Sequence, residues 1–320
     1  MISLGIQLEK LCAEACDEVV LVAPFVKAFV LKELLAKVST DITVRCVTRW
    51  QPEEILRGVS DLEVWSLIKK RPRSSLLLRP DLHAKFYRAD EKCLVGSANL
   101  TAKALGWSNS PNLELLVPLT ASEPTLKTFE AQLFSGCVQA NESLFEQMSA
   151  TVQLLAEKYP DLSPFVSDTP DASQEETSAS DEKVPVEAWL PTLRNPEDLY
   201  LAYSGQQEKL TTAAREAATS DLRSLPTIPN LPKTAFEACI GALLLQKPIV
   251  QQVDAFVETP QRFGAVRDLL ASQPCASLSN FDADRAWQTL MRWLLHFLPH
   301  RYALSVPNYS EIFYRVKTER

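Results

Sequence analysis

Short apolar runs separated by segments of helical periodicity are the feature that most constrains the fold of this chain. Val19–Val22 is a continuous aliphatic run, rich in β-branched residues and followed by proline, as expected of a buried strand. Residues 5–18 and 27–38 carry apolar side chains at helical spacing, and residues 42–48 form a second apolar run. Further strands are expected at residues 75–78, 84–87, 92–95 and 113–117. Further helices are expected at 53–58, with Gly58 as its C-terminal stop, and at 61–70, with Asp61 as its N-cap. Strands that alternate with helices favour an α/β layer fold.

A polar segment divides the chain. Residues 167–183 contain almost no large apolar side chain and are rich in Ser, Thr, Asp and Glu, so they cannot bury enough surface to offset the entropy of ordering. We therefore expect an α/β domain at 1–160, an acidic Ser/Thr-rich linker at 161–185 and a mainly α-helical accessory domain at 186–320. The helical domain is indicated by two apolar stripes at helical spacing: Phe236, Ile240, Leu243 and Leu244, and then Trp287, Leu290, Met291, Leu294, Phe297 and Leu298.

Composition favours a cytoplasmic protein. The seven cysteines include no CxxC pair, so free thiols in a reducing compartment are expected. The first 18 residues carry acids where a signal peptide needs an apolar run, and the longest apolar stretch, around residues 240–245, is too short to cross a bilayer. The net charge of −7 is uneven, because residues 1–120 carry 16 basic and 14 acidic side chains, whereas residues 121–185 carry 3 and 12. The slightly basic N-terminal part is compatible with a polyanionic substrate.

The segment from Asp81 to Val117 contains the candidate catalytic residues. His83 and Lys85 are two positions apart, so in a strand both would point to one face. Ser97 and Asn99 follow Gly96, and Glu114 lies in the next expected strand between two leucines. A carboxylate in that apolar context needs a partner, and an imidazole would serve. These groups suit phosphodiester cleavage: a histidine nucleophile, cationic and amide ligands for the phosphate oxygens, and a carboxylate that orients the imidazole.

The same residues resemble a known signature. His83-Ala84-Lys85 followed by Asp90 and by Gly96-Ser97-Ala98-Asn99 is similar to the HxKxxxxD and GSxN motifs of the phospholipase D superfamily. The resemblance covers roughly residues 5–120 and implies a mixed β-sheet flanked by helices. It implies that His83 is the nucleophile, that Lys85 and Asn99 bind phosphate with help from Ser97, and that Glu114 orients His83. Asp90 completes the motif, although in this family that aspartate is often structural.

The resemblance also implies how such a site is assembled. Members with a single motif are typically homodimers that act without a metal ion or other cofactor, and many with this wording are nucleases. The general acid must be a second histidine, yet the chain has only His83, His296 and His300. The latter two lie on or just after a predicted helix without an HxK partner, where a structural or surface role is expected. A twofold axis that brings two copies of His83 together would complete the site.

A basic run precedes His83 and consists of Lys69, Lys70, Arg71, Arg73 and Arg79. It is either a solvated helix end and loop or a rim that attracts the phosphates of a nucleic acid. Trp107 could stack on a base, but an isolated tryptophan in a loop is more often a packing residue.

Three functions remain open on the sequence. The first is a metal-independent nuclease, with DNA favoured over RNA as substrate, within a bacterial restriction, defence or DNA-modification system that could supply further subunits. The second is a lipid phosphodiesterase, although no basic amphipathic helix suggests a membrane surface. The third is an inactive nucleic-acid-binding or assembly subunit. Cleavage in EDTA that depends on His83 would separate the first from the others.

Overall fold

The computed structural model describes residues 3–159, 184–279, 281–307 and 310–316. Residues 160–183, which include almost all of the expected linker, lie outside the described residues. The chain divides into two compact units, Met1–Ser178 and Ala179–Arg320, each with its own internal contacts.

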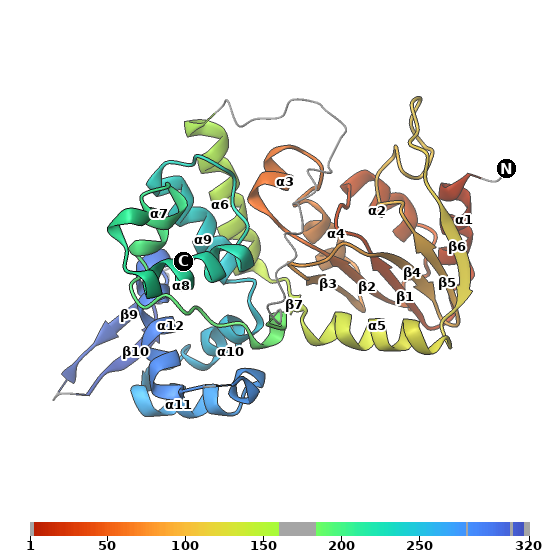
Figure 1. Cartoon of the computed structure of the whole chain (residues 1–320). Coiled ribbons are helices and arrows are strands. Elements are labelled where there is room, and N and C mark those ends of the chain that lie inside the picture. Colours follow the sequence, from red (N-terminus) through yellow and green to blue (C-terminus); the bar gives the residue numbers. More distant parts are fainter. Residues whose placement is uncertain (1–2, 160–183, 280, 308–309, 317–320) are drawn as a thin grey trace. The chain divides into compact units, whose positions relative to one another are not determined.

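A seven-stranded mixed sheet forms the centre of the first unit (Figure 1). Its strand order is β6-β5-β4-β1-β2-β3-β7. The first three strands in sequence are parallel, β4 is antiparallel to β1, and β5 and β6 continue antiparallel to the edge. The strands are β1 (Glu18–Val22), β2 (Thr43–Thr48), β3 (Ser74–Leu78), β4 (Lys85–Ala89), β5 (Lys92–Gly96), β6 (Leu116–Thr120) and β7 (Val138–Gln139).

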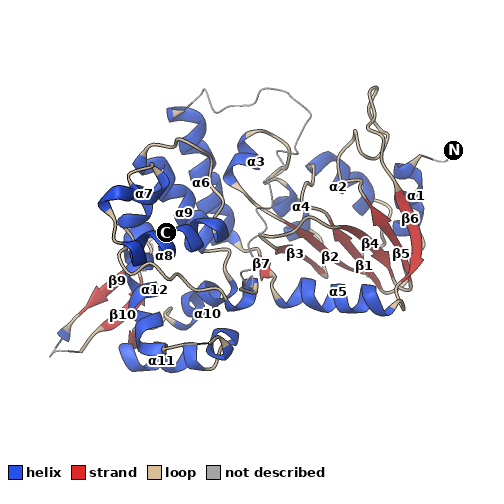
Figure 2. Ribbon diagram, in the orientation of Figure 1, coloured by secondary structure: helices blue, strands red, loops and turns tan. Residues whose placement is uncertain are grey.

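Helices cover both faces of this sheet (Figure 2). On one face, α5 packs Phe129 and Leu133 against Val20, Val22 and Phe86. On the other face, α1 contacts β4 and β5, and α4 contacts β3. The helices of this unit are α1 (Leu4–Ala13), α2 (Ala28–Leu35), α3 (Pro52–Leu56), α4 (Val64–Lys70), α5 (Pro124–Ser135) and α6 (Glu142–Lys158). The expected α/β class is confirmed, with the helices forming layers against a mixed sheet.

Element boundaries follow local chemistry with two instructive exceptions. Gly58 has a φ of 67°, which suits glycine and ends the α3 region as predicted. Asp61, expected to cap the helix that follows it, instead accepts a hydrogen bond from the Ala28 amide at the start of α2, at 2.8 Å. The last strand was expected from residue 113 but begins at Leu116, because its partner β5 ends at Gly96, which pairs with Leu116. Residues 113–115 therefore have no strand opposite them in β5.

The second unit is mainly helical, as expected. Its described elements are the helices α7 (Asp198–Tyr203), α8 (Thr212–Ser224), α9 (Lys233–Leu244), α10 (Pro248–Phe256), α11 (Phe263–Ala271) and α12 (Ala283–Phe297), the 3₁₀ turns Val186–Ala188, Gln207–Lys209 and Pro274–Ser277, and the strands β8 (Gln261–Arg262), β9 (Tyr302–Ser305) and β10 (Ile312–Arg315). Every member of both predicted apolar stripes is buried. The small sheet β8-β10-β9 was not predicted. It is tied to α10 through Asp254, which accepts hydrogen bonds from Arg301 at 2.7 and 2.6 Å and from Tyr302 at 2.7 Å.

All seven cysteines are free, in line with the absence of a disulfide framework. Within the residues that the structure describes, no helix is long and apolar enough to cross a membrane.

Candidate active site

Most of the motif residues lie at one edge of the sheet in the first unit, where β4 begins and β5 ends. His83 lies in the loop that joins β3 to β4, two residues before the first residue of β4, Lys85. Lys85 pairs with Gly96, the last residue of β5, so the GSAN segment leaves the sheet directly beside the start of β4. Parallel strands β1, β2 and β3 end at this same edge, because β1 is antiparallel to β4. The topology therefore unites two parts of the motif that are 11 positions apart in the sequence, from Lys85 to Gly96.

The segment after Gly96 is held tightly by the backbone around it. The buried Tyr87 hydroxyl donates to the Ala98 carbonyl at 2.5 Å, and the Leu100 amide donates to the Phe25 carbonyl at 3.1 Å. Burial raises the pKa of Tyr87 well above its ordinary value, and the nearby charges of Cys46 and Glu114 act in the same direction. Tyr87 therefore stays a neutral donor that fixes Ala98. Sequence patterns had not singled it out, although it shares a strand face with Lys85.

Gly96 is required by a backbone contact. A Cβ atom at this position would lie 1.8 Å from the Leu115 carbonyl oxygen. The chain entering β6 therefore leaves no room for a side chain here, and its Leu115 carbonyl also accepts a hydrogen bond from the Ser97 amide at 3.0 Å.

Asn99 lies between the two anchored residues Ala98 and Leu100. Its side-chain oxygen is buried and has no hydrogen-bond partner among the described residues. A buried polar atom without a partner costs on the order of 1–3 kcal/mol, so such atoms call for an explanation, and a ligand is one.

Glu114 does not have the environment that its neighbours suggested. Its flanking residues Leu113 and Leu115 are exposed, at 102% and 62%, because residues 113–115 precede β6. The half-buried carboxylate accepts a hydrogen bond from the Ser97 hydroxyl and another from the Asn112 side chain at 3.3 Å. Ser97 in turn accepts a hydrogen bond from the Leu115 amide at 3.1 Å. Among the hydrogen bonds within residues 3–159, those of Glu114 thus go to Ser97 and Asn112, not to His83.

His83 and Lys85 differ in their exposure. The imidazole is exposed, whereas the Lys85 side chain is half-buried. The residue before His83, Leu82, is only 4% exposed and belongs to the core beneath α5. The backbone on either side of His83 is thus held by the core and by β4, while the ring faces solvent.

Asp90 lies at the far end of β4 from Lys85. Its carboxylate accepts hydrogen bonds from the backbone amides of Cys16 at 2.7 Å, Asp17 at 3.0 Å and Glu18 at 2.9 Å. Partial burial opposes ionisation of Asp90, but these three amides outweigh it and keep its pKa below the ordinary value. The structure places Asp90 at the entry to β1, away from the other motif residues.

Most of the basic run is also separated from His83. It lies at the end of α4 and the turn into β3, the opposite end of β3 from the His83 loop. Arg71 donates to the Ile42 carbonyl at 2.9 Å, and its partial burial lowers its pKa. Lys69 pairs with Glu142 on α6. The remaining two members at this end, Lys70 and Arg73, are exposed.

Arg79 is nearer in sequence to His83 but has structural partners. It donates to the Gln132 and Leu133 carbonyls at the end of α5, at 2.7 and 3.1 Å, and pairs with Asp81 at 2.6 Å. Trp107 likewise packs within the unit, since a Cβ on Gly5 would meet its indole nitrogen at 2.0 Å. The packing interpretation of Trp107 is therefore the one that the contacts support.

The other two histidines belong to the second unit. The His296 imidazole lies 3.3 Å from the Glu237 carboxylate and edge-on to Phe297, and His300 is exposed.

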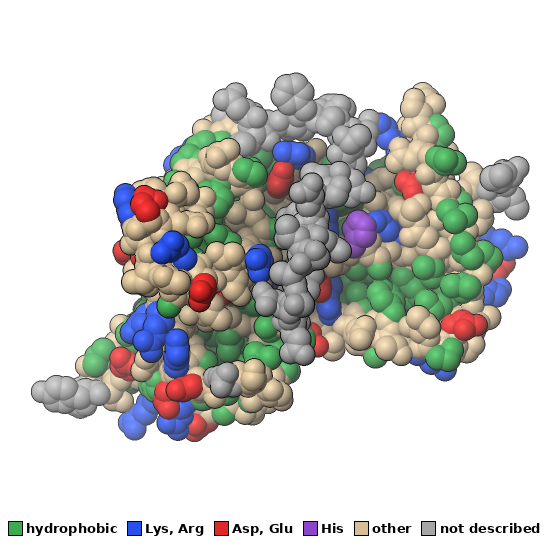
Figure 3. All heavy atoms as spheres, viewed as in Figure 1, with side chains coloured by type: hydrophobic (Ala, Val, Ile, Leu, Met, Phe, Trp, Pro, Cys, Tyr) green, Lys and Arg blue, Asp and Glu red, His purple; other side chains and the backbone are tan. Residues whose placement is uncertain are grey.

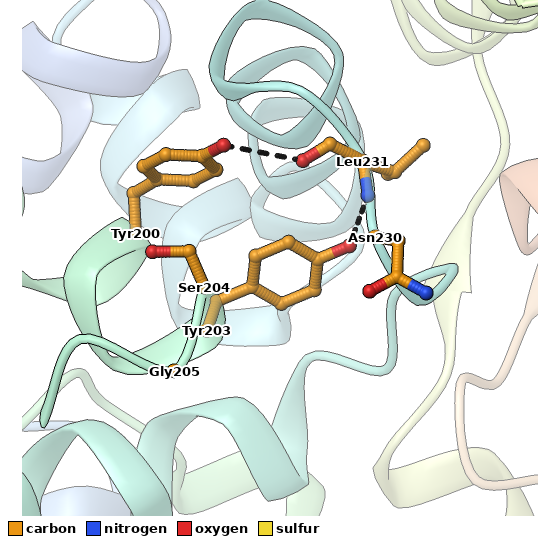
Figure 4. Close-up of a pocket in the computed structure, with 6 residues that line it drawn as sticks. All are labelled: Tyr200, Tyr203, Ser204, Gly205, Asn230 and Leu231. Carbon is orange, nitrogen blue, oxygen red and sulfur yellow. Dashed lines mark hydrogen bonds between the residues drawn. The ribbon is translucent and has the colours of Figure 1, made fainter.

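The second unit has a cleft of about 410 Å³ (Figure 4). Its lining residues are Tyr200, Tyr203, Ser204, Gly205, Asn230 and Leu231. Both tyrosine hydroxyls are engaged by backbone groups, and the lining includes no carboxylate, imidazole or ammonium group. Among the described residues, no group of three His, Cys, Asp or Glu side chains is placed to hold a metal ion.

No protein-family model and no curated protein matches this chain. Part of it is similar to several solved structures, including the following three. NucT from Helicobacter pylori is 18% identical over 42% of this chain and 89% of its own, with a TM-score of 0.34. Nuc from Salmonella typhimurium, a phospholipase D family member, is 15% identical over 43% of this chain and 90% of its own, with a TM-score of 0.34. Phosphatidylserine synthase from Haemophilus influenzae Rd KW20 is 14% identical over 48% of this chain and 42% of its own, with a TM-score of 0.35.

Proposed function

We propose that this protein is a phosphodiesterase of the phospholipase D type, a nuclease that works without a metal ion or other cofactor through a phosphohistidine intermediate. The observation that carries the proposal is the pairing of Lys85 with Gly96, which sets the HxK and GSxN segments side by side at one sheet edge. Two further observations support the proposal: the imidazole of His83 is exposed, and the buried side-chain oxygen of Asn99 has no hydrogen-bond partner in the described part of the chain.

In the proposed reaction, an unprotonated ring nitrogen of His83 attacks phosphorus and forms an N–P bond. The bond from phosphorus to the leaving oxygen breaks, and that oxygen takes a proton from a second imidazole. Water then attacks the phosphohistidine and gives a proton back to the second imidazole, while the N–P electron pair returns to His83. Lys85 and Asn99 stabilise the charge on the phosphate oxygens. We assign Ser97 an auxiliary phosphate contact and Glu114 the orientation of His83, for which Glu114 would exchange its hydrogen bond to Ser97.

The second imidazole is proposed to be His83 of a second copy in a homodimer. The edge strand β6 offers a surface for this contact: Val117 and Leu119 are each 41% exposed, beside the exposed Leu115. Apolar side chains gather over the sheet above α5 (Figure 3). Pro118 in the same strand lacks an amide hydrogen, which disfavours extension of the sheet by another strand and leaves packing through side chains. Val117→Asp should therefore yield monomers and abolish activity together.

The proposed substrate is nucleic acid, with DNA favoured, and the proposed setting is the cytoplasm of a bacterium. There the protein would act in restriction, defence or DNA modification, as a protein of the DpdK type, with residues 186–320 as an accessory domain for target or partner selection. The charge balance of the N-terminal part, 16 basic to 14 acidic side chains over residues 1–120, is compatible with DNA.

The decisive experiment is a cleavage assay in EDTA with single- and double-stranded DNA, RNA and phospholipid vesicles as parallel substrates. We expect DNA cleavage that His83→Ala abolishes, and a covalent phosphorylated protein, stable to base and labile to acid, that His83→Ala lacks. Cleavage only with divalent ions would refute the mechanism, and lipid turnover alone would refute the nuclease. In mixtures of equal parts wild type and His83→Ala, a shared site leaves about a quarter of the activity, whereas a self-contained site leaves about half.

A further inference from the structure

A partly buried arginine contacts the backbone directly before His83. Arg49 follows Thr48, the last residue of β2, and its side chain is only 18% exposed. One terminal nitrogen, Nη1, donates to the Leu82 carbonyl oxygen at 2.9 Å. The guanidinium also lies over the Phe25 ring, 5.2 Å from its centroid.

Glu54, on α3, fixes the opposite side of the same guanidinium. Arg49 Nε donates to its Oε2 atom at 3.1 Å, and Nη2 pairs with Oε1. The Glu54 side chain is 11% exposed, and its burial raises its pKa against the opposing effect of Arg49. The two-point contact holds the plane of the guanidinium, so the direction in which Nη1 points is set.

The Arg49 contact acts on the peptide bond directly before His83. The imidazole is exposed, and Leu82 is its immediate neighbour. The Leu82 side chain is anchored in the core and its amide donates to the Arg79 carbonyl at 3.2 Å, but its carbonyl is oriented by Arg49. That carbonyl belongs to the peptide bond that joins Leu82 to His83, so its rotation would swing the backbone nitrogen of His83.

We propose that Arg49 is a positioning residue for His83, which it orients through the Leu82 carbonyl, and that Glu54 holds Arg49 in place for this purpose. The inference rests on the proposed role of His83 as nucleophile. A nucleophile must approach phosphorus in line with the leaving oxygen, and a displacement of about 1 Å can cost on the order of 100-fold in rate. Arg49 touches no reacting atom and is not assigned a role in phosphate binding.

The test separates positioning from stability by removing both partners together. Arg49→Met with Glu54→Met leaves no unpaired buried charge, and replacing a buried ion pair by apolar side chains is often neutral for stability. The Leu82 carbonyl nevertheless loses its donor. With bis(p-nitrophenyl) phosphate in EDTA, we expect kcat to fall about 10- to 100-fold with KM within about twofold. Hydrogen exchange of the peptide that spans residues 80–85 should also accelerate.

Two further variants keep the test decisive. Arg45→Met removes an arginine that lies within β2, whose partner Glu18 retains Arg88, and should leave both readouts unchanged. Should the double variant fail to fold, Arg49→Lys keeps the charge beside Glu54 but lacks the planar fork, and we expect it to lower kcat in the same way. A folded double variant, or Arg49→Lys, with wild-type kcat and wild-type exchange would overturn the inference. If the wild type hydrolyses no phosphodiester, the proposed function fails, while the exchange measurement still decides whether Arg49 orders the His83 loop.

Discussion

Replacing Asp90 by Asn should destabilise the protein without removing the proposed catalytic groups. The Asp90 carboxylate accepts hydrogen bonds from three backbone amides, two at Oδ1 and one at Oδ2. In the Asp90→Asn variant the Oδ1 atom can remain an oxygen, but an NH₂ group replaces Oδ2 and faces the Cys16 amide. The hydrogen bond from Cys16 is therefore lost, and the two remaining hydrogen bonds have a neutral instead of a charged acceptor. Asparagine suits the φ of 49° at this position, so no backbone strain is added.

The expected cost is about 2 kcal/mol. A hydrogen bond to a charged group contributes roughly 1.5–3 kcal/mol, and we take the lower part of that range because Asp90 is only partly buried. Since the pKa of Asp90 is lowered in the folded protein, its stabilisation is present above the unfolded pKa of about 3.9 and is lost as the pH falls through the folded pKa. The stability difference between wild type and Asp90→Asn should therefore be full at pH 7 and shrink below about pH 4.

Urea unfolding of the full chain measures this difference, provided that both proteins have the same m-value. Hydrogen exchange of the amides of residues 16–18 shows whether the loss is local to the Asp90 contacts. The matched control is His83→Ala. Removal of the exposed imidazole should lower the free energy of unfolding by less than about 0.5 kcal/mol, yet it should abolish phosphodiester cleavage. An Asp90→Asn protein with wild-type stability and no activity would refute the structural role and make Asp90 a participant in the chemistry.

Three other substitutions test the packing around the site and in the second unit. Gly96→Ala should cost about 2 kcal/mol or more, because its Cβ would lie 1.8 Å from the Leu115 carbonyl, and a lower urea midpoint would show it. Burial raises the pKa of Asp221 to about 6, so the folded form binds a proton more tightly than the unfolded chain. Relative to Asp221→Asn, the free energy of unfolding of the wild type should therefore fall by about 2 kcal/mol as the pH rises from about 4 to 6, and then level off. The same pH dependence of stability in both proteins would contradict this. Arg79→Gln should lower the melting temperature and the free energy of unfolding, the latter by about 1–3 kcal/mol, because the carbonyls at the end of α5 lose their donor. The control Lys70→Gln should change the free energy of unfolding by less than about 0.5 kcal/mol. A loss of DNA affinity without destabilisation would instead make Arg79 a phosphate contact.

The sequence was most informative where a property is local. Strand β1 and helix α12 were predicted because an apolar run and a helical stripe are visible within one segment, and the burial of Trp287 and its stripe follows. The sequence was misleading at Glu114, whose leucine neighbours resemble those of a buried strand. Whether such a segment pairs depends on the length of β5, and β5 ends at Gly96.

The candidate site shows the same division. Spacing alone predicted that His83 and Lys85 would point to one face of a strand, and the family resemblance connected them to Asn99, whereas β4 in fact begins only at Lys85. The positions of Asp90 at the entry to β1 and of Arg71 at the opposite end of β3 could not be read from the motif, because contiguity in sequence says nothing about which end of a strand a residue reaches.

The amino-acid sequence by itself thus determined the alternation of strands and helices and the apolar faces, and it singled out the candidate reactive side chains, because all of these depend on the chemistry of neighbouring residues. Only the tertiary structure decided that Lys85 pairs with Gly96 on the neighbouring strand and that Glu114 accepts a hydrogen bond from Ser97. It alone also decided that Arg49 donates a hydrogen bond to the carbonyl before His83. The contact from Arg49 to Leu82 spans 33 positions, and contacts of that kind arise from strand order and register, which the composition of neither segment encodes.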